Sequence, residues 1–388
     1  MHRKQPLPLL STHNRWRPLG NAAFFFAVDR PIPQHRHSLV LSRLRIASLR
    51  QLPSGIFSIV MATGIVAIAV DELALTVLAK IVFALAVLAY VLLWMLFALR
   101  LWRYWHDVRD DARHSERALG FFAIVAATSV VGTALAGSFG IPAALPLWLA
   151  TLALWFAITY TILPGLMIAR DKSSFGSGFN GVWLLVVVAT ESVAVLGAPV
   201  AAEGHAISAT LEMFTALCFW LVGGMLYLWL IALIFYRCIF LPMSVEDVTP
   251  TYWINMGAMS IATLAGTSLL HESNAFVQLH TIAPFIAGIT LGFWATATWW
   301  IPILLVLGFW RHVWMRYPLR YAQANWSAVF PIGMYAVATR SIAGVLGVPF
   351  VVPIAEAFAW LALCAWAANV AGLWWRLAFD PRELVRPL

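Results

Sequence analysis

The residues with the clearest chemical content lie in one apolar stretch near the end of the chain, residues 325–340. Within it, Phe330 is followed by Pro331, Gly333 and finally Arg340. Proline removes a backbone donor and clashes with the preceding turn, so we expect a helix to bend at Pro331. A membrane helix with a break, small residues and a charge usually lines a pathway. We therefore predict a pore here, kinked at Pro331 and Gly333 and closed by Phe330.

Neutral polar and glycine positions in other apolar segments form a second group of candidates. Such groups can partly replace the water around an anion without trapping it, which conduction requires. The same residue types also serve helix packing or bond back to their own helix, so we expect about half of them to face a pore. The pore-lining candidates are Thr63, Gly64, Thr128, Ser129, Thr190, Asn255 and Ser260.

Two charged residues, Glu191 and Arg340, also fall inside apolar segments. An unpaired charge in the bilayer costs at least about 2.5 kcal/mol, so each should pair or face water. Three roles are open for Arg340: reaching the membrane surface, pairing with Glu191 or Glu356, or attracting an anion at the outer end of the pore. Glu191 is predicted to be paired, to face away from the pore, or to couple proton movement to transport.

Composition places the chain among membrane proteins. Its 388 residues are 62% hydrophobic and 11% charged, and a water-soluble domain of this size could not bury so much apolar surface. The net charge of +8 comes from cations between apolar runs rather than from a basic patch, so no nucleic-acid partner is expected. The cysteines lack paired spacing, and His271 and His280 lack the spacing of a zinc helix. We predict no disulfide, metal or cofactor.

Hydropathy divides the chain into membrane spans. A bilayer core of about 30 Å needs about 20 apolar residues per helix. Ten segments satisfy this length, which predicts an all-α integral membrane protein. The predicted spans are 53–70, 76–99, 118–137, 145–168, 181–198, 207–236, 252–270, 283–309, 325–345 and 352–375.

The distribution of lysine and arginine sets the predicted topology. Cations gather before the first span, after the last, and in the loops that follow the even-numbered spans. By the positive-inside rule, both termini are cytoplasmic. We predict a basic, disordered cytoplasmic tail over 1–50 without a signal peptide, a ten-helix domain over 51–376, and a cytoplasmic tail over 377–388.

Spans of two kinds alternate along the chain. Odd-numbered spans are short and rich in small or hydroxyl residues, whereas even-numbered spans are longer and rich in leucine, isoleucine, valine and tryptophan. This alternation predicts a helical hairpin used five times, with a small-residue inner helix and an apolar outer helix. Weak internal symmetry of this kind marks channels and transporters. The alternative reading of the small residues is close helix packing alone.

Three motifs resemble those of the tellurite-resistance/dicarboxylate transporter family. They are the run Phe57-Ser-Ile-Val-Met-Ala-Thr-Gly64, the run Pro250-Thr-Tyr-Trp-Ile-Asn-Met-Gly-Ala-Met-Ser260, and the segment from Trp326 to Pro331. The family includes bacterial tellurite-resistance proteins, fungal malate permeases, sulfite efflux pumps and the slow-type anion channels of plant guard cells. The resemblance covers about residues 50–376.

The resemblance implies five helical hairpins around a quasi-fivefold axis, with the odd helices forming the pore, in a homotrimer with one pore per subunit. It also implies that Phe330 occludes the pore, because the gating phenylalanine of the family immediately precedes the proline. Two features depart from the family pattern: Ala62 replaces a frequent glycine, and Glu191 and Arg340 add charge within the spans.

The sequence therefore predicts transport of small anions across a bacterial inner membrane. C4-dicarboxylates such as malate are the first candidates, and tellurite or sulfite-type oxyanions are further ones. No Walker-type nucleotide loop is present, so transport should be passive or driven by an ion gradient. An inorganic-anion channel for chloride or nitrate is the alternative. A membrane-embedded enzyme would need histidine or aspartate clustered at one depth, which the sequence lacks.

Overall fold

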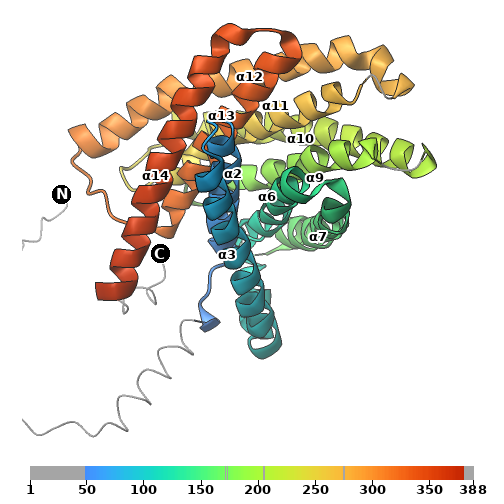
Figure 1. Ribbon diagram of the computed structural model, residues 1–388. Coiled ribbons are helices and arrows are strands. Elements are labelled where there is room, and N and C mark those ends of the chain that lie inside the picture. Colours follow the sequence, from blue (N-terminus) through green and yellow to red (C-terminus); the bar gives the residue numbers. More distant parts are fainter. Residues whose placement is uncertain (1–48, 171, 173, 204–205, 274–275, 380–388) are drawn as a thin grey trace, which may run out of the picture. The chain divides into compact units, whose positions relative to one another are not determined.

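The computed structural model describes residues 49–379 apart from 171, 173, 204–205 and 274–275. In this part of the chain, ten long helices pair into five helical hairpins, labelled in Figure 1. The first helix of each hairpin is the shorter one. These inner helices are α2 (Ser58–Asp71), α6 (Phe122–Phe139), α9 (Leu185–Ala202), α11 (Ile254–His271) and α13 (Trp326–Leu346).

The second helix of each hairpin packs along the first and is longer. Helix α2 contacts both α3 and α14, and Figure 1 shows α14 passing beside it. The outer helices are α3 (Thr76–Arg103), α7 (Ile141–Ile168), α10 (Ala206–Phe240), α12 (Val277–Phe309) and α14 (Val352–Phe379).

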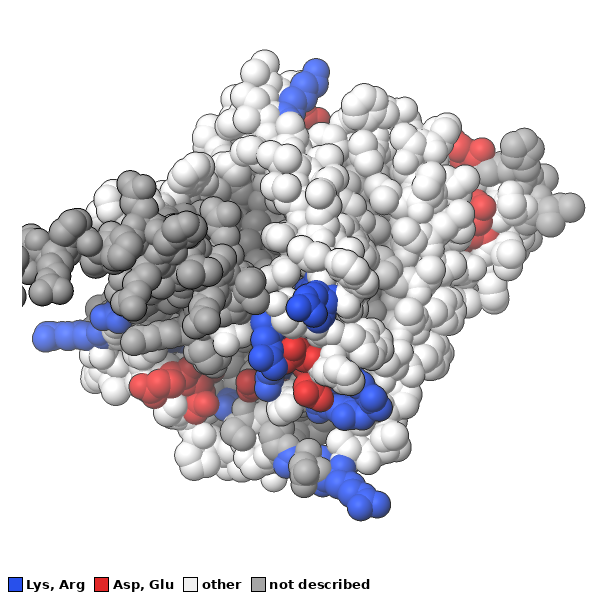
Figure 2. Space-filling model, turned by 90° about the horizontal axis from the view of Figure 1, so that it is seen from below, with Lys and Arg blue, Asp and Glu red and all other residues white. Residues whose placement is uncertain are grey.

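The inner helices form a closed ring. Each contacts the next in chain order, and α13 contacts α2 to complete the circle. Their side chains are mostly buried, whereas the outer helices expose leucine, isoleucine, phenylalanine and tryptophan. Figure 2 shows one face of the molecule, with charged side chains gathered over part of it and a broad uncharged surface beside them. The outer surface is therefore suited to lipid.

Nine helices of the described residues are long and apolar enough to cross a membrane, which confirms an all-α integral membrane protein. The remaining inner helix, α11, overlaps the predicted span 252–270 and takes its place in the ring between α9 and α13. Polar residues such as Asn255, Ser260 and Thr263 lower its hydropathy. That α11 also crosses the membrane stays a prediction.

Most inner helices begin with a single tight turn. Three-ten turns precede four of them: η1 (Ser54–Phe57), η2 (Gly181–Leu184), η3 (Pro250–Trp253) and η5 (Gln323–Asn325). Proline starts or precedes two of these turns, where its missing backbone donor costs nothing. Short helices occupy the connections, namely α4 (Trp105–Asp111), α5 (Ser115–Leu119), α8 (Phe175–Gly178), the π-turn η4 (Trp310–Trp314) and η6 (Pro349–Val351).

Glycines allow the ring helices to approach closely. At Gly257 of α11, an added Cβ would lie 2.7 Å from Cγ of Pro331 on α13. At Gly333 of α13, it would lie 3.0 Å from Cγ2 of Ile65 on α2. Small residues at such contacts are the usual means by which membrane helices pack. Similar contacts join α2 to α6 and α6 to α9, at Gly64 against Val130 and at Gly132 against Leu196.

We predict that Gly257→Ala destabilises the ring by about 1–3 kcal/mol, because the new methyl group meets a rigid proline ring and its backbone. Gly288→Ala in α12 is the matched control, since nothing lies within 4 Å of the added carbon there. Thermal unfolding in detergent should show a lower midpoint for the first variant only. Equal midpoints would contradict the assigned contact.

Candidate functional site

Phe330 faces the interior of the ring. It lies nine residues from Thr339 on α13, about two and a half turns, so the two side chains occupy opposite faces of the helix. The hydroxyl of Thr339 accepts a hydrogen bond from Nε1 of Trp294 on outer helix α12, at 3.0 Å. Phe330 therefore points away from the outer helices. Its side chain is 2% exposed, so it is fully packed at that depth.

The helix around Phe330 continues through Pro331 from Trp326 to Leu346. On one side of α13, Pro331 packs against Gly257 of α11. On the other side, Ile65 of α2 packs against Gly333. These two contacts fix the rotation of α13 between its ring neighbours α11 and α2. The predicted kink pair, Pro331 and Gly333, thus lies at the two helix contacts that flank Phe330.

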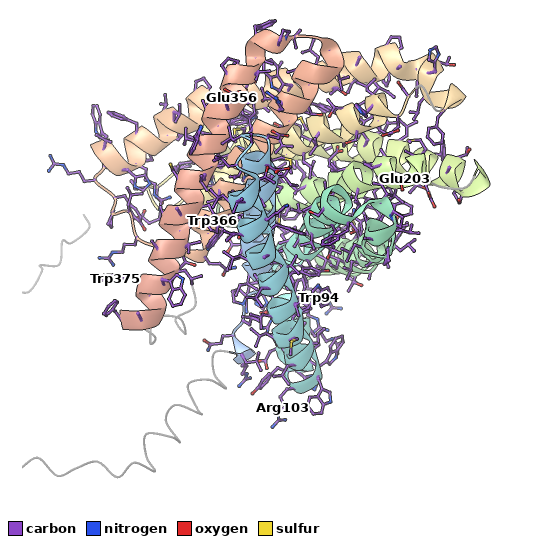
Figure 3. All side chains as sticks on the ribbon, viewed as in Figure 1. Trp94, Arg103, Glu203, Glu356, Trp366 and Trp375 are labelled. Carbon is purple, nitrogen blue, oxygen red and sulfur yellow. The ribbon has the colours of Figure 1, made fainter. Side chains whose placement is uncertain are left out.

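A belt of hydrogen bonds joins the outer helices to the ring. Each outer helix donates from an aromatic side chain to the inner helix of the next hairpin, rather than to its own partner. The belt is made of Tyr90 to Thr128 (3.0 Å), Trp155 to Thr190 (2.9 Å), Trp220 to the Ala262 carbonyl (2.9 Å), Trp294 to Thr339 (3.0 Å) and Trp366 to Thr63 (3.1 Å). The last bond returns from α14 to α2, and Figure 3 shows Trp366 beside α2.

The belt determines where three of the predicted pore-lining threonines point. The hydroxyls of Thr63, Thr128 and Thr190 each accept from an outer helix and donate to a carbonyl four residues earlier in their own helix. Their hydrogen-bonding capacity is used on the outward side of the ring. The structure therefore places these hydroxyls away from the face that carries Phe330.

The remaining candidates divide among several roles. Gly64 packs against α6, and the Ser129 hydroxyl bonds to the Ser192 carbonyl of α9 at 2.6 Å, so both lie at joints between ring helices. Ser260 bonds back to the Met256 carbonyl of its own helix. Asn255 is fully buried, and its side-chain nitrogen and oxygen have no partner within the described part of the chain.

We predict that Thr63→Val costs about 1–3 kcal/mol of stability, because it leaves the indole N–H of Trp366 without an acceptor. Thr133→Val is the control, since that hydroxyl bonds back to the Ser129 carbonyl of its own helix. Unfolding midpoints and anion selectivity would both be measured. If Thr63→Val changes anion selectivity without lowering stability, the result would contradict the outward position and indicate that Thr63 lines the pore.

Glu191 faces outward, and no charged partner reaches it among the described residues. Its side chain is fully buried on α9, with neither carboxyl oxygen hydrogen-bonded. The carboxyl lies directly against Gly223 of outer helix α10, where a Cβ would collide with it. The predicted structural ion pair is therefore wrong for this residue, and Arg340 interacts with Glu356 instead. The contact with Gly223 of outer helix α10 agrees with another of the predicted alternatives, in which Glu191 faces away from the pore.

Because an unpartnered charge is costly at that site, we predict that the neutral, equally sized Glu191→Gln is tolerated at under about 1 kcal/mol. Glu191→Lys should fail to fold stably, because its longer cation would also meet Gly223. Unfolding midpoints test both. Loss of pH-driven uptake in a stable Glu191→Gln variant would instead favour proton coupling.

Arg340 lies near the end of α13, and this end of the ring is called the Arg340 end below. Its guanidinium is 4.0 Å from a carboxyl oxygen of Glu356 on α14, and both side chains are about half exposed. A pair of this distance and exposure contributes little to stability. Arg340 is also the one lysine or arginine within the bounds of the five inner helices.

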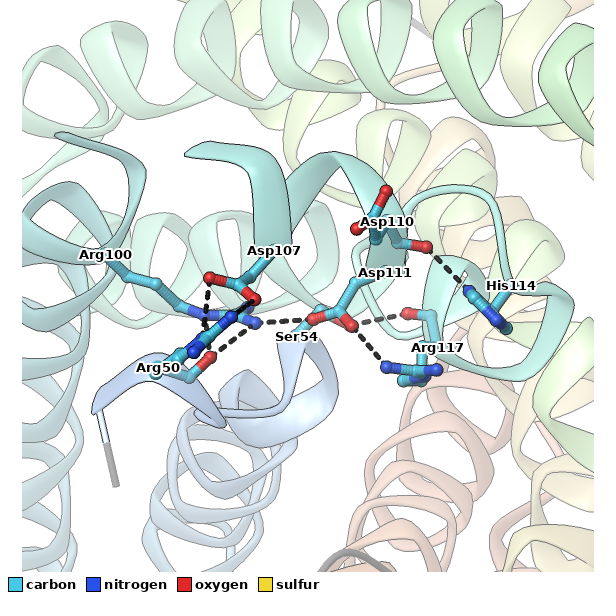
Figure 4. A network of polar contacts seen from close by, with 8 residues as sticks. All are labelled: Arg50, Ser54, Arg100, Asp107, Asp110, Asp111, His114 and Arg117. Atoms are coloured by element: carbon cyan, nitrogen blue, oxygen red, sulfur yellow. Dashed lines mark hydrogen bonds and ion pairs between the residues drawn. The ribbon is translucent and has the colours of Figure 1, made fainter. Parts of the chain in front are cut away.

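The opposite end carries a buried ion-pair network that sequence reasoning missed. Arg100, at the end of α3, donates to Asp111 at 2.6 Å and to the Arg50 carbonyl, and it is 2% exposed. Asp111 also accepts from Arg117 at 2.7 Å, while Arg50 binds Asp107 (Figure 4). This end is called the Arg100 end. Figure 3 shows Arg103 and Glu356 at opposite ends of the helices.

A similar arrangement recurs at the end of α10. Arg237 is 2% exposed and donates to the Gly176 carbonyl, the Tyr252 hydroxyl and Asp247. The backbone N–H of Ser244, a smaller hydrogen bond from its side chain and the charge of Arg237 lower the pKa of the Asp247 carboxyl, against its partial burial. In both networks an arginine in the last turn of an outer helix meets an aspartate ten or eleven residues later. That repeated spacing was the sequence signal available for these sites.

Comparison with known proteins agrees with this architecture. The sequence profile of a family described as voltage-dependent anion channel matches residues 51–374. The chain belongs to this family. Membership confirms the resemblance drawn from the three motifs, and the helices establish a multi-pass membrane protein.

Individual relatives cover less of the chain. An uncharacterised membrane protein of Mycobacterium tuberculosis is 36% identical over 153 residues, which are 39% of this chain and 77% of that protein. An uncharacterised transporter of Methanocaldococcus jannaschii is 26% identical over 151 residues, 39% of this chain and 42% of the relative. A second uncharacterised transporter of the same archaeon is 25% identical over the same length.

Proposed function

We propose that this protein carries small anions through the axis of the five-helix ring, and that Phe330 occludes the passage. The observation that carries the proposal is the position of Phe330 on the inward face of α13, fully packed and held between two close helix contacts. An aromatic ring in a narrow apolar passage is a steric and dewetting barrier to a hydrated ion. Family membership and the transporter relatives support anion transport as the general activity.

For the substrate class, C4-dicarboxylates such as malate are the first candidates, with tellurite and sulfite-type oxyanions next. One observation favours chloride or nitrate as the second proposal. Arg340 is the one lysine or arginine within the inner helices, and it lies ten residues from Phe330, near the end of α13. A doubly charged substrate usually meets paired arginines or lysines, whereas a monovalent ion can pass a neutral wall.

We further propose that the chain acts as a homotrimer in a bacterial inner membrane, with the Arg100 end in the cytoplasm. Four arginines at or beside the ends of outer helices support this orientation by the positive-inside rule: Arg100, Arg237, Arg311 and Arg376. The predicted tails, 1–50 and 377–388, lie almost entirely outside the described residues. They stay predictions, as does the trimer.

We predict that Phe330→Ala raises anion leak several-fold, because it removes the side chain that closes the ring. Liposomes containing purified protein would be assayed with chloride, nitrate, malate, sulfite and tellurite, with and without a pH gradient. Phe219→Ala is the matched control: it removes a buried phenylalanine of outer helix α10 that packs on Trp155, 4.6 Å between ring centres.

The control should lose stability, about 3–5 kcal/mol for a buried phenylalanine, without gaining leak. Equal leak from both variants would show that loosened packing, not an opened gate, admits the ions. Abolished malate uptake in Phe330→Ala would make Phe330 part of a carrier site. Absence of flux of every anion in both the wild type and Phe330→Ala, each shown to be folded, would overturn the transport proposal.

A further inference from the structure

Glu72 and Arg340 lie at the same end of the ring, near enough for their charges to interact. Helices α2 and α13 touch where Ile65 packs on Gly333. Seven residues further along each helix, about two turns, come Glu72 and Arg340. Because the inner helices run in the same direction, this advance carries both side chains to the Arg340 end on the same contact line. The charge of Arg340 acts on the Glu72 carboxyl there.

Glu72 directly follows α2 with helical backbone angles, so the inward face of that helix extends to it. It lies nine residues after Thr63, about two and a half turns, and therefore on the opposite face. Thr63 is held outward by Trp366 of α14. By the same geometry that places Phe330 inside the ring, the half-buried Glu72 points toward the axis at the mouth.

Two glycines of the inner helices are exposed at this end. Gly137 of α6 is nine residues from the outward-facing Thr128, and Gly344 of α13 is fourteen residues, about four turns, from Phe330. Both glycines are therefore on inward faces. Both are exposed, and an added Cβ at either would meet nothing within 4 Å. The inner helices are thus less tightly packed at the Arg340 end than at the level of Phe330, and the space between them at this end is called the vestibule below.

Four other charged groups lie on Glu72's own segment or on the helices that pack against α2 and α13 near this end. The charge of Arg340 on α13 acts on Glu72, and a carboxyl oxygen of Glu356 on α14 lies 4.0 Å from Arg340. Asp71 precedes it in the chain, and Lys80 lies on α3; both are exposed. Helix α6, which also packs on α2, carries no charged residue. Of the three carboxyl groups, those of Asp71, Glu72 and Glu356, we assign Glu72 to the inward face of the ring.

We propose that Glu72 sets the charge of the vestibule: anions enter past Arg340 while Glu72 holds its proton, and they are repelled once Glu72 ionises. The ionised carboxylate would add a negative charge in the path of the anion and neutralise the adjacent guanidinium. Charge in a narrow, low-dielectric mouth strongly alters the local concentration of permeant ions. This inference rests on the proposed anion passage along the ring.

Glu72 is expected to ionise within a pH range in which anion flux can be measured. Burial raises its pKa to about 8, with Arg340 opposing the shift and Asp71 adding to it. The carboxyl is neutral below that value and negative above it. Between pH 7 and pH 9 the neutral fraction falls from about nine-tenths to about one-tenth. Anion flux that requires the neutral form should fall about tenfold over this interval.

The test compares anion flux at pH 7 and pH 9, equal on both sides of the liposome membrane, for wild type and three variants. Glu72→Gln should keep the flux of pH 7 at both values, because its amide does not ionise. Arg340→Gln should lower flux at both. Glu203→Gln, which removes an exposed carboxyl at the end of α9, should behave as wild type.

A second measurement follows the proton itself. The infrared band of the protonated Glu72 carboxyl should appear in the difference between wild type and Glu72→Gln at pH 7 and vanish by pH 9. A pH profile unchanged by Glu72→Gln would overturn the inference, as would a Glu72 carboxyl already ionised at pH 7.

The two proposals can fail separately. If Phe330→Ala raises leak but Glu72→Gln leaves the pH profile unchanged, the passage stands and the vestibule inference fails. If Glu72→Gln removes the pH dependence while Phe330→Ala has no effect, Glu72 stands and the gate fails. Absence of anion flux from every folded variant would overturn both.

Discussion

The close approach of the five inner helices is the constraint on which the rest of the structure depends. Helices in a bilayer gain little from hiding apolar surface, so packing of small residues must hold them together. Glycines at four joints of the ring meet a valine, a leucine, a proline and an isoleucine of the neighbouring helix. A ring packed this tightly leaves its axis to whichever side chains face inward, and Phe330 is one of them.

The aromatic belt supplies hydrogen-bond partners for polar atoms of the inner helices. Threonine and serine hydroxyls inside a membrane need partners, and the outer helices supply indole and phenol donors for several of them. The belt also fixes the rotation of each inner helix about its own axis. Rotation decides which residues face the passage, so groups on the outside of the ring position residues on its inside.

Much of the fold could be predicted from the sequence, because its signals are local. Each predicted span overlaps an observed helix, and the alternation of small-residue and apolar helices corresponds to the inner and outer positions. The face of each helix was harder to predict. Thr63 and Thr190 have the residue type of a pore wall, but their neighbours in space, Trp366 and Trp155, come from other hairpins. Residue type predicts capacity for hydrogen bonding, whereas direction depends on contacts distant in the chain.

The belt also has a consequence for how the chain reaches its final form. Four of its bonds join residues 35 to 45 positions apart, so they can form as successive hairpins enter the membrane. The fifth, between Trp366 and Thr63, spans 303 positions. The ring therefore stays open on one side until nearly all of the chain has been synthesised. Until then, the Thr63 hydroxyl of α2 has only the bond to its own helix, and the bond from Trp366 of the last helix is added when the circle closes. Closing of the circle is therefore a late step of folding.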